Sequence, residues 1–224
     1  MQNKDENLNL AEKISDFVQR NRKGIFIVTG VLILLFAGSV TYLSLKDIFN
    51  KKAIAKVEEL NQRYEEIRPL LGDDHYASDI EKLIADLSDF AGNKNGYAAG
   101  RAWSIVAQIH SAMEEWPQSE EAWLKAARAG DKTYLGPISL FNAAAAAQEQ
   151  GKYEQAIELL QKCVDHKFEF PAAARAQFSI GRLYEMLDNY PAAVDAYRIV
   201  LINWPDMPVW QNLARSRITA IEIK

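Results

Sequence analysis

Few residues in this sequence have the types and spacing that catalysis or metal binding requires. The single cysteine, Cys163, falls on the inner face of a predicted amphipathic helix, where a buried structural thiol is expected rather than a nucleophile. His75, His110 and His166 lie far apart, and Asp73-Asp74-His75 is a turn without further ligands. The sequence has no GxSxG elbow, Walker loop or GxGxxG fingerprint. We therefore expect no enzymatic activity, no cofactor and no metal site.

The composition indicates an acidic globular chain. Its 224 residues are 49% hydrophobic and 25% charged, which is typical of a folded protein and unlike a disordered one. The formal net charge of −4 argues against a nucleic-acid binder, which needs a basic face. One cysteine excludes a disulfide framework. We expect neither a nucleic acid nor a small-molecule substrate as a ligand.

One segment departs from this average. Residues 25–45 contain no charged residue, and at ~1.5 Å rise per residue a helix of this length extends ~31 Å, about the thickness of a bilayer core. The rival interpretation is a cleaved signal peptide with a small-residue site at residues 37–39, but the apolar run continues past it to Leu45. We therefore predict an uncleaved, single-pass membrane anchor.

The orientation of this anchor is not decided by the flanking lysines and arginines, which are similar in number at both ends. The leader has 24 residues, whereas 179 residues follow the span, and long domains are translocated largely independently of their charge. We therefore expect the leader in the cytoplasm, and a cytoplasm-facing repeat region is the alternative. Within the leader, Leu10, Ile14, Phe17 and Val18 share one face, which predicts a short amphipathic helix at the membrane surface.

The rest of the chain has the periodicity of amphipathic helices, beginning with a long helix over residues 48–70. Three segments place an alanine at the same point of such a helix, at Ala122, Ala156 and Ala193, with spacings of 34 and 37 residues. Pro137, Pro171 and Pro205 follow at intervals of 34 residues and are predicted to end each unit. A helical hairpin that repeats every 34 residues resembles the tetratricopeptide repeat.

The last unit matches the tetratricopeptide pattern best. Its matching residues are Ile180, Gly181, Tyr184, Ala193, Tyr197 and Pro205. Small residues such as Gly181 and Ala193 are needed where the two helices of a unit approach, and the tyrosines fill the space between units. Residues 165–170 are interpreted as a three-residue insertion in a loop between units.

The predicted fold is therefore all-α, with one N-terminal transmembrane helix followed by an α-solenoid of tetratricopeptide-like hairpins. The predicted parts are a cytoplasmic leader (1–24), the transmembrane helix (25–45), membrane-proximal helices with a half-repeat (46–95), the repeats (96–208) and a C-terminal capping helix (209–224). The capping helix is expected to close the apolar end of the stack through Trp210, Leu213, Ile218 and Ile221.

A solenoid of this kind offers a binding face lined by the first helix of each unit. In the first unit, the repeat pattern places Ser104, Ala107, Ser111 and Glu114 on that face. The predicted protein-binding residues of the next two units are Phe141, Gln148, Arg175, Phe178, Arg182 and Glu185. Two exposed phenylalanines beside two arginines suit a peptide with apolar and acidic residues. The alternative is that preceding helices shield both rings.

The order of these parts resembles a known family. A leader helix that ends in the charged turn at residues 17–23, one span, a long helix and degenerate repeats are together similar to the YfgM family, the ancillary subunits of the bacterial SecYEG translocon. The resemblance implies a bacterial inner-membrane protein with a cytoplasmic N-terminus and a periplasmic repeat domain. It also implies translocon subunits, the membrane-anchored periplasmic chaperone PpiD and exported chains as partners.

The expected function is a non-enzymatic, membrane-anchored scaffold that helps to handle exported proteins. An envelope-assembly adaptor of the same topology, acting on cell-wall or outer-membrane machinery, is the alternative.

Overall fold

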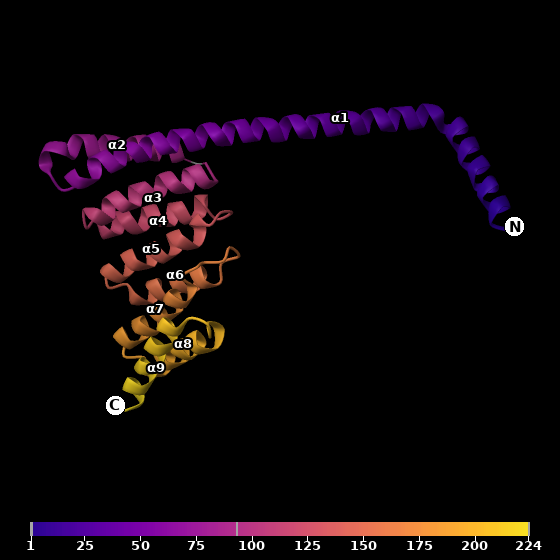
Figure 1. The fold of residues 1–224 in the computed structure, drawn as a ribbon. Helices are drawn as coiled ribbons and strands as arrows, with labels where there is room; N and C mark the ends of the chain where they lie inside the picture. The colour runs from indigo at the N-terminus through magenta and orange to yellow at the C-terminus, as the bar shows by residue number, and fades with distance from the viewer. Residues whose placement is uncertain (1, 93, 224) are drawn as a thin grey trace. The chain divides into compact units, whose positions relative to one another are not determined.

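The computed structural model describes the backbone of residues 2–92 and 94–223 and the side chains of residues 12–92 and 94–223. Over these residues the chain is built of helices joined by short turns (Figure 1), and the predicted all-α fold is confirmed. The chain divides into two units, residues 1–52 and residues 53–224, and each is described by itself.

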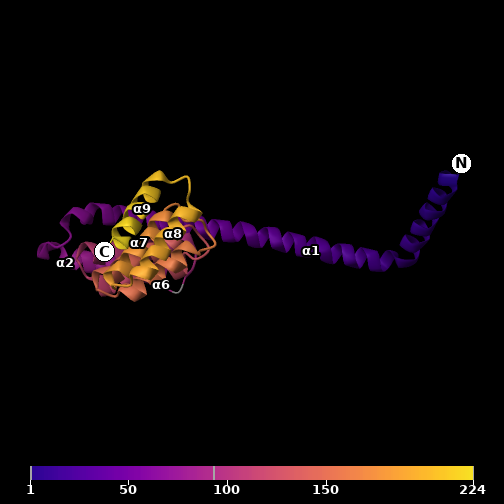
Figure 2. The same cartoon turned by 90° about the horizontal axis from the view of Figure 1, so that it is seen from below.

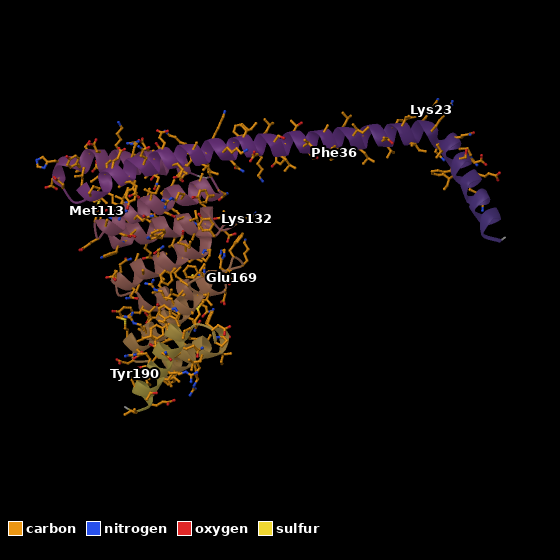
Figure 3. The ribbon with its side chains drawn as sticks, in the orientation of Figure 1. Lys23, Phe36, Met113, Lys132, Glu169 and Tyr190 are labelled. Carbon is orange, nitrogen blue, oxygen red and sulfur yellow. The ribbon has the colours of Figure 1, made fainter. Side chains whose placement is uncertain are left out.

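The first unit consists of the N-terminal part of α1 (Gln2–Ile67), and its apolar segment is exposed. Phe26, Leu34 and Phe36 keep 76%, 74% and 71% of their surface exposed, and side chains such as Phe36 project around the helix in Figure 3. The Thr41 hydroxyl donates to the Ala37 carbonyl at 2.9 Å, so this polar group is satisfied within the helix. Among the described residues, one helix is long and apolar enough to cross a membrane, a criterion that an N-terminal signal sequence also meets.

α1 is continuous where the sequence predicted separate helices. It passes without a break through the expected turn at residues 17–23 and through the expected start at residue 48. No proline interrupts it before Pro69, which lies in the short 3₁₀ helix η1 (Arg68–Leu70). In the predicted leader stripe Ile14 and Phe17 are exposed, and the Leu10 side chain lies outside the described residues. Membrane-surface binding by the leader stays a prediction.

The second unit begins within the last turns of α1 and stacks the remaining helices in chain order (Figure 1). These elements are η2 (Asp74–Tyr76), α2 (Ala77–Ala91), α3 (Tyr97–Ala112), α4 (Trp116–Ala129), α5 (Leu135–Glu149), α6 (Tyr153–Val164), α7 (Ala173–Met186), α8 (Tyr190–Asn203) and α9 (Pro208–Glu222). Val57, Leu60 and Tyr64 of α1 share a core with Leu83 and Leu87 of α2, so these two helices form the first hairpin of the stack.

Three hairpins follow, α3–α4, α5–α6 and α7–α8, and their turns repeat every 37 residues. Each turn contains a residue with positive φ, at Glu114 (59°), Gly151 (73°) and Asp188 (55°). The next backbone N–H donates to the carbonyl five residues earlier, at 2.9, 3.0 and 2.9 Å respectively. This is the bond of a Schellman-type helix end, which left-handed residues allow. The second helices then begin at aromatic residues, Trp116, Tyr153 and Tyr190.

This regular period corrects the register predicted for the first hairpin. Ser119, and not Ala122, lies 37 residues before Ala156 and 74 before Ala193. Ser119 is fully buried, and its hydroxyl donates to the Ala107 carbonyl at 3.2 Å, which marks the close approach of the two helices. Serine is small enough for this position. The pattern of repeated alanines therefore pointed to Ala122, which lies three residues further along the chain. Residues 165–170 lie in the loop between α6 and α7, and they do not lengthen their unit, because the turns at 151 and 188 are as far apart as those at 114 and 151.

The prolines also differ from the prediction. Pro137 does not end a unit but is buried in the first turn of α5, where a missing N–H costs nothing. Pro171 and Pro205 lie in the loops before α7 and α9. The even spacing of these prolines therefore does not mark equivalent structural positions.

The last helix, α9, packs beside α7 and α8, as Figures 1 and 2 both show. Trp210, Ile218 and Ile221 contact the core at this end of the stack, as predicted. Leu213 does not, because it is 42% exposed. The buried positions of α9 are taken by Ala214 and Gln211, whose amide donates to the Leu201 carbonyl at 3.0 Å.

Candidate functional site: the inner groove of the repeats

The first helices of consecutive hairpins, α3 and α5, lie side by side and form one wall of a groove of about 600 Å³. We call this pocket the inner groove. Its lining residues are Tyr64, Arg68, Gln108, Ser111, Ala112, Trp116, Trp123, Asn142, Ala145, Ala146 and Glu149. They come from the end of α1, η1, α3, α4 and α5, so the groove depends on the stacking of three hairpins.

Small residues create the space in the inner groove. Ala112, Ala145 and Ala146 lie on the two first helices, where longer side chains would fill the pocket. Tyr64, Trp116 and Trp123 add aromatic surface around them. Alanine beside aromatic rings gives a hollow that is apolar and can accept side chains of a partner.

Two amides give the inner groove its polar character. The Gln108 side chain donates to the Ser104 carbonyl at 3.2 Å, and the Asn142 side chain donates to the Ile138 carbonyl at 3.0 Å. Each amide is thereby oriented by its own helix. Each also keeps an oxygen that can accept a hydrogen bond, for example from the backbone of a bound peptide.

Arg68 and Glu149 place opposite charges at the groove. The Arg68 guanidinium lies 3.1 Å from the Glu65 carboxylate, and both side chains are more than half exposed. An exposed pair of this kind is weak, so Arg68 can exchange Glu65 for a carboxylate of a partner.

Two of the predicted binding residues meet between the second and third hairpins. The Arg175 guanidinium lies 5.1 Å from the centroid of the Phe141 ring, a cation–π geometry. The Phe141 ring is half-buried and lies 5.5 Å from the ring of Phe170 in the loop between α6 and α7. Arg175 itself is exposed, so its charge is available at this surface.

Phe178 is not an exposed binding residue, and this part of the prediction is wrong. It is only 8% exposed, and its ring centroid lies 5.1 Å from Tyr197 and 5.6 Å from Trp210. The shielding comes from α8 and α9, which follow in the chain, and not from a preceding helix. Phe141 occupies the equivalent position in α5. Its ring is contacted by Arg175 of α7 and remains half-buried.

Arg182 and Glu185 line a second hollow with Met186 and Arg217. Glu185 is engaged within the fold: it accepts a hydrogen bond from the Tyr197 hydroxyl at 2.5 Å and another from the Arg217 Nε at 2.9 Å. Burial, followed by the nearby Glu185 carboxylate, raises the pKa of Tyr197, so this phenol stays neutral. Arg182 is exposed. Glu185 thus fastens α9 to the stack, while Arg182 faces solvent.

The other residues predicted for this face also differ in exposure. Gln148 is half-buried near the end of α5, whereas Ser104 and Ala107 are buried at 3% and 0% exposure. The burial of Ala107 follows from the corrected register, in which it is equivalent to the buried Ala144, whereas Ser104 is equivalent to the half-buried Phe141. Glu114 lies in the turn after α3. Gln108 was not predicted because of the register error, since it is the residue equivalent to Ala145. Tyr64 and Arg68 were not predicted because the groove also includes the hairpin that precedes the repeats.

Cys163 has the surroundings of a structural thiol. It is fully buried, and its thiol donates to the Pro137 carbonyl at 3.2 Å. Burial raises the pKa of this thiol to about 12, which leaves almost no thiolate at neutral pH. The arrangement suits packing between α5 and α6 and not nucleophilic attack.

Comparison with known proteins agrees with the helical architecture. The tetratricopeptide repeat family model matches residues 106–165 and 141–208. A TPR repeat-containing protein of Treponema pallidum (strain Nichols) is 34% identical over 145 residues. The match covers 64% of this chain and 60% of that relative, so the chain spans less than two thirds of the relative's length.

Solved structures show the same fold. The TPR-like repeats of a kinesin light chain from Podosopora anserina superimpose with a TM-score of 0.53 over 74% of this chain and 86% of that one, at 14% identity. A variant of the same repeats with one substitution gives the same TM-score at 13% identity, over 74% of this chain and 85% of the variant. Repeats of this family typically serve as non-enzymatic scaffolds for protein partners. The helical stack is thus similar to tetratricopeptide repeats, and the matched residues, 106–208, make up less than half of the chain.

Proposed function

We propose that this protein is a membrane-anchored scaffold that binds segments of partner proteins in the inner groove. The observation that carries this proposal is the groove itself, whose alanines leave space beside aromatic rings and oriented amides. A peptide laid across α3 and α5 would bury apolar side chains against Ala145 and Ala146. Its backbone N–H groups could donate to the oxygens of Gln108 and Asn142.

Arg175 and Arg182 lie outside the inner groove, nearer to the C-terminal end of the stack. Both are exposed on α7, and the Phe141 ring supports the Arg175 guanidinium. We propose that they contact acidic residues of the same partner. The binding residues are therefore Gln108, Asn142, Arg175 and Arg182, without Phe178, whose replacement would disturb the packing of α9.

The role of the anchor is to hold the scaffold at a membrane. The exposed apolar surface of residues 25–45 is unfavourable in water and suits the hydrocarbon core of a bilayer. A scaffold held at a membrane meets other membrane proteins at a high effective concentration, so weak contacts in the groove are sufficient.

For the partners, we propose translocon subunits, a periplasmic chaperone such as PpiD and exported chains at a bacterial inner membrane. The N-terminus would be cytoplasmic and the repeats periplasmic. The support is the resemblance of the overall order of parts to the YfgM family, together with the bacterial relative. The alternatives are an envelope-assembly adaptor of the same topology and a cytoplasm-facing scaffold.

A photo-crosslinking residue at position 145 tests this function in cells. Ala145 is exposed at the groove, whereas Lys162 is exposed on α6 and does not line the groove, so position 162 is the matched control. We expect position 145, and not position 162, to capture translocon subunits, a chaperone or exported chains. The double replacement Gln108→Ala and Asn142→Ala should reduce this capture about tenfold, because two hydrogen bonds to the partner are lost.

The outcomes separate the alternatives. Capture of cell-wall or outer-membrane assembly proteins from position 145 would favour the adaptor, and capture of cytoplasmic proteins would favour the reversed orientation. Equal capture from positions 145 and 162 would reject the inner groove as the binding site.

A further inference from the structure

Another pocket, of about 560 Å³, lies at the ends of α2 and α4 and has a strongly basic lining. We call it the basic pocket. Its lining residues are Ser88, Gly92, Lys94, Asn95, Trp103, Lys125, Arg128 and Ala129. It has no residue in common with the inner groove.

Three cations and no carboxylate line the basic pocket, although the whole chain carries a net charge of −4. Lys94 comes from the loop after α2, and Lys125 and Arg128 come from the last turns of α4. Within the part of the chain that the structure describes, Arg128 makes no ion pair, and its side chain is exposed. This local excess of positive charge attracts anionic groups to the pocket.

Aromatic rings position both lysines of the basic pocket. The Lys94 ammonium lies 4.7 Å from the centroid of the Phe90 ring, and the Lys125 ammonium lies 4.6 Å from that of Trp103. Lys125 also contacts the Glu121 carboxylate at 2.8 Å, but Glu121 is 67% exposed, so this pair is weak and can be exchanged. Each lysine is thus positioned by a ring of a different helix, Phe90 of α2 and Trp103 of α3.

The loop that carries Lys94 and Asn95 is fixed at both ends. The Lys94 N–H donates to the Ala91 carbonyl at 2.9 Å, and the Gly96 N–H donates to the Ala129 carbonyl at 2.7 Å. The second bond ties the loop to the end of α4, which carries Arg128. Lys94 and Arg128 are therefore held on the same pocket before any ligand binds, which lowers the entropic cost of binding.

We propose that the basic pocket binds an acidic segment of a partner protein, in which carboxylates are interleaved with apolar residues. Three cations carried by two elements, with the Trp103 ring among them, match carboxylates interleaved with apolar side chains along a peptide. The Trp103 ring and the aliphatic stems of the lysines provide apolar contact between the charges. Asn95 and Ser88 offer further hydrogen-bond donors to the carboxylates. This surface is distinct from the inner groove and provides a second contact for a partner.

The test uses the full chain in detergent and a fluorescein-labelled peptide of alternating glutamate and leucine, with binding followed by fluorescence anisotropy. We expect saturable binding that weakens with salt, and no binding of the peptide with glutamine in place of glutamate. Replacing Lys94, Lys125 and Arg128 by glutamine should weaken binding by at least about tenfold. The matched control replaces Lys82, Lys162 and Arg215, which removes the same charge elsewhere and should change affinity less than about twofold.

Several results would overturn the proposal. One is the absence of binding by the unaltered chain at about 1 mM peptide, the weak limit of specific affinity. Another is an equal loss in the control variant, which would indicate a response to net charge alone. Displacement of the peptide by inorganic phosphate, but not by chloride at the same ionic strength, would assign the pocket to a phosphate group instead. The Gln108→Ala and Asn142→Ala variant should bind this peptide with unchanged affinity. A negative result for the basic pocket would therefore not count against the inner groove, because different residues test the two surfaces.

Discussion

The apolar segment of α1 and the interior of the repeats use similar residue types in opposite ways. Phe36 in the first unit is 71% exposed, whereas Tyr197 in the second is fully buried. A Cβ added at Gly30 would meet no atom within 4 Å, but one added at Gly181 would lie 2.5 Å from the Tyr197 ring. The repeats satisfy their apolar residues within the chain. The apolar segment does not, and this is the property expected of a helix whose environment is lipid.

Polar groups also have different roles in the apolar segment and in the repeats. In the apolar segment, hydroxyls such as Thr41 donate to their own helix, which needs no other element. In the repeats, buried polar groups join different helices, as Ser119 of α4 joins Ala107 of α3. Glu120 of α4 is 5% exposed and accepts hydrogen bonds from Gln150 at 2.7 Å, from Lys152 at 3.0 Å and from Gln155. This carboxylate therefore links the first repeat hairpin to the second.

The largest expected effect is the loss of this link. Glu120→Ala should lower the free energy of unfolding of the repeats by about 3 kcal/mol, because it leaves a lysine and two amides without their acceptor. The neighbouring Glu121→Ala is the matched control, since its exposed pair with Lys125 is worth less than about 1 kcal/mol. Urea unfolding of the full chain in detergent, followed by tryptophan fluorescence, measures both. Equal effects of the two replacements would show that Glu120 does not stabilise the stack.

A smaller effect is expected from one added methyl group. Gly181→Ala should destabilise the repeats by about 1–3 kcal/mol, because the methyl group overlaps the Tyr197 ring and the surrounding core is closely packed. The same change at Gly30 should leave repeat stability within about 0.5 kcal/mol, since it is distant from any neighbour. Thermal unfolding monitored by circular dichroism compares the two variants. A stable Gly181→Ala protein would contradict the close helix packing described for the last hairpin.

The sequence predicted the last hairpin well because its motif residues are themselves the packing contacts. Gly181 faces Tyr197, and Ala193 is fully buried, as the repeat pattern requires. The first hairpin was placed three residues out of register, because the close approach accepts serine at position 119 as readily as alanine. The turn residues at 114, 151 and 188 carry the true 37-residue period, but a glutamate and an aspartate with positive φ are hard to recognise from sequence.

The candidate site was less predictable than the fold. Burial of Phe178 depends on Trp210, which lies in a different helix and has no fixed distance in the sequence from the residue that it covers. The inner groove likewise joins Tyr64 to Asn142, so its composition follows from how hairpins stack. Helical periodicity shows which face of one helix is apolar. It does not show which neighbouring helix covers that face.

The most direct test of the contrast between the two regions is the mass of the mature protein in the membrane fraction of cells. An uncleaved anchor predicts a protein that retains residues 1–39, stays in the membrane after carbonate extraction and requires detergent for release. A shorter protein beginning after Ser39 and recovered in the soluble fraction would contradict this account, because residues 25–45 would then be a signal sequence and the repeats would have no anchor.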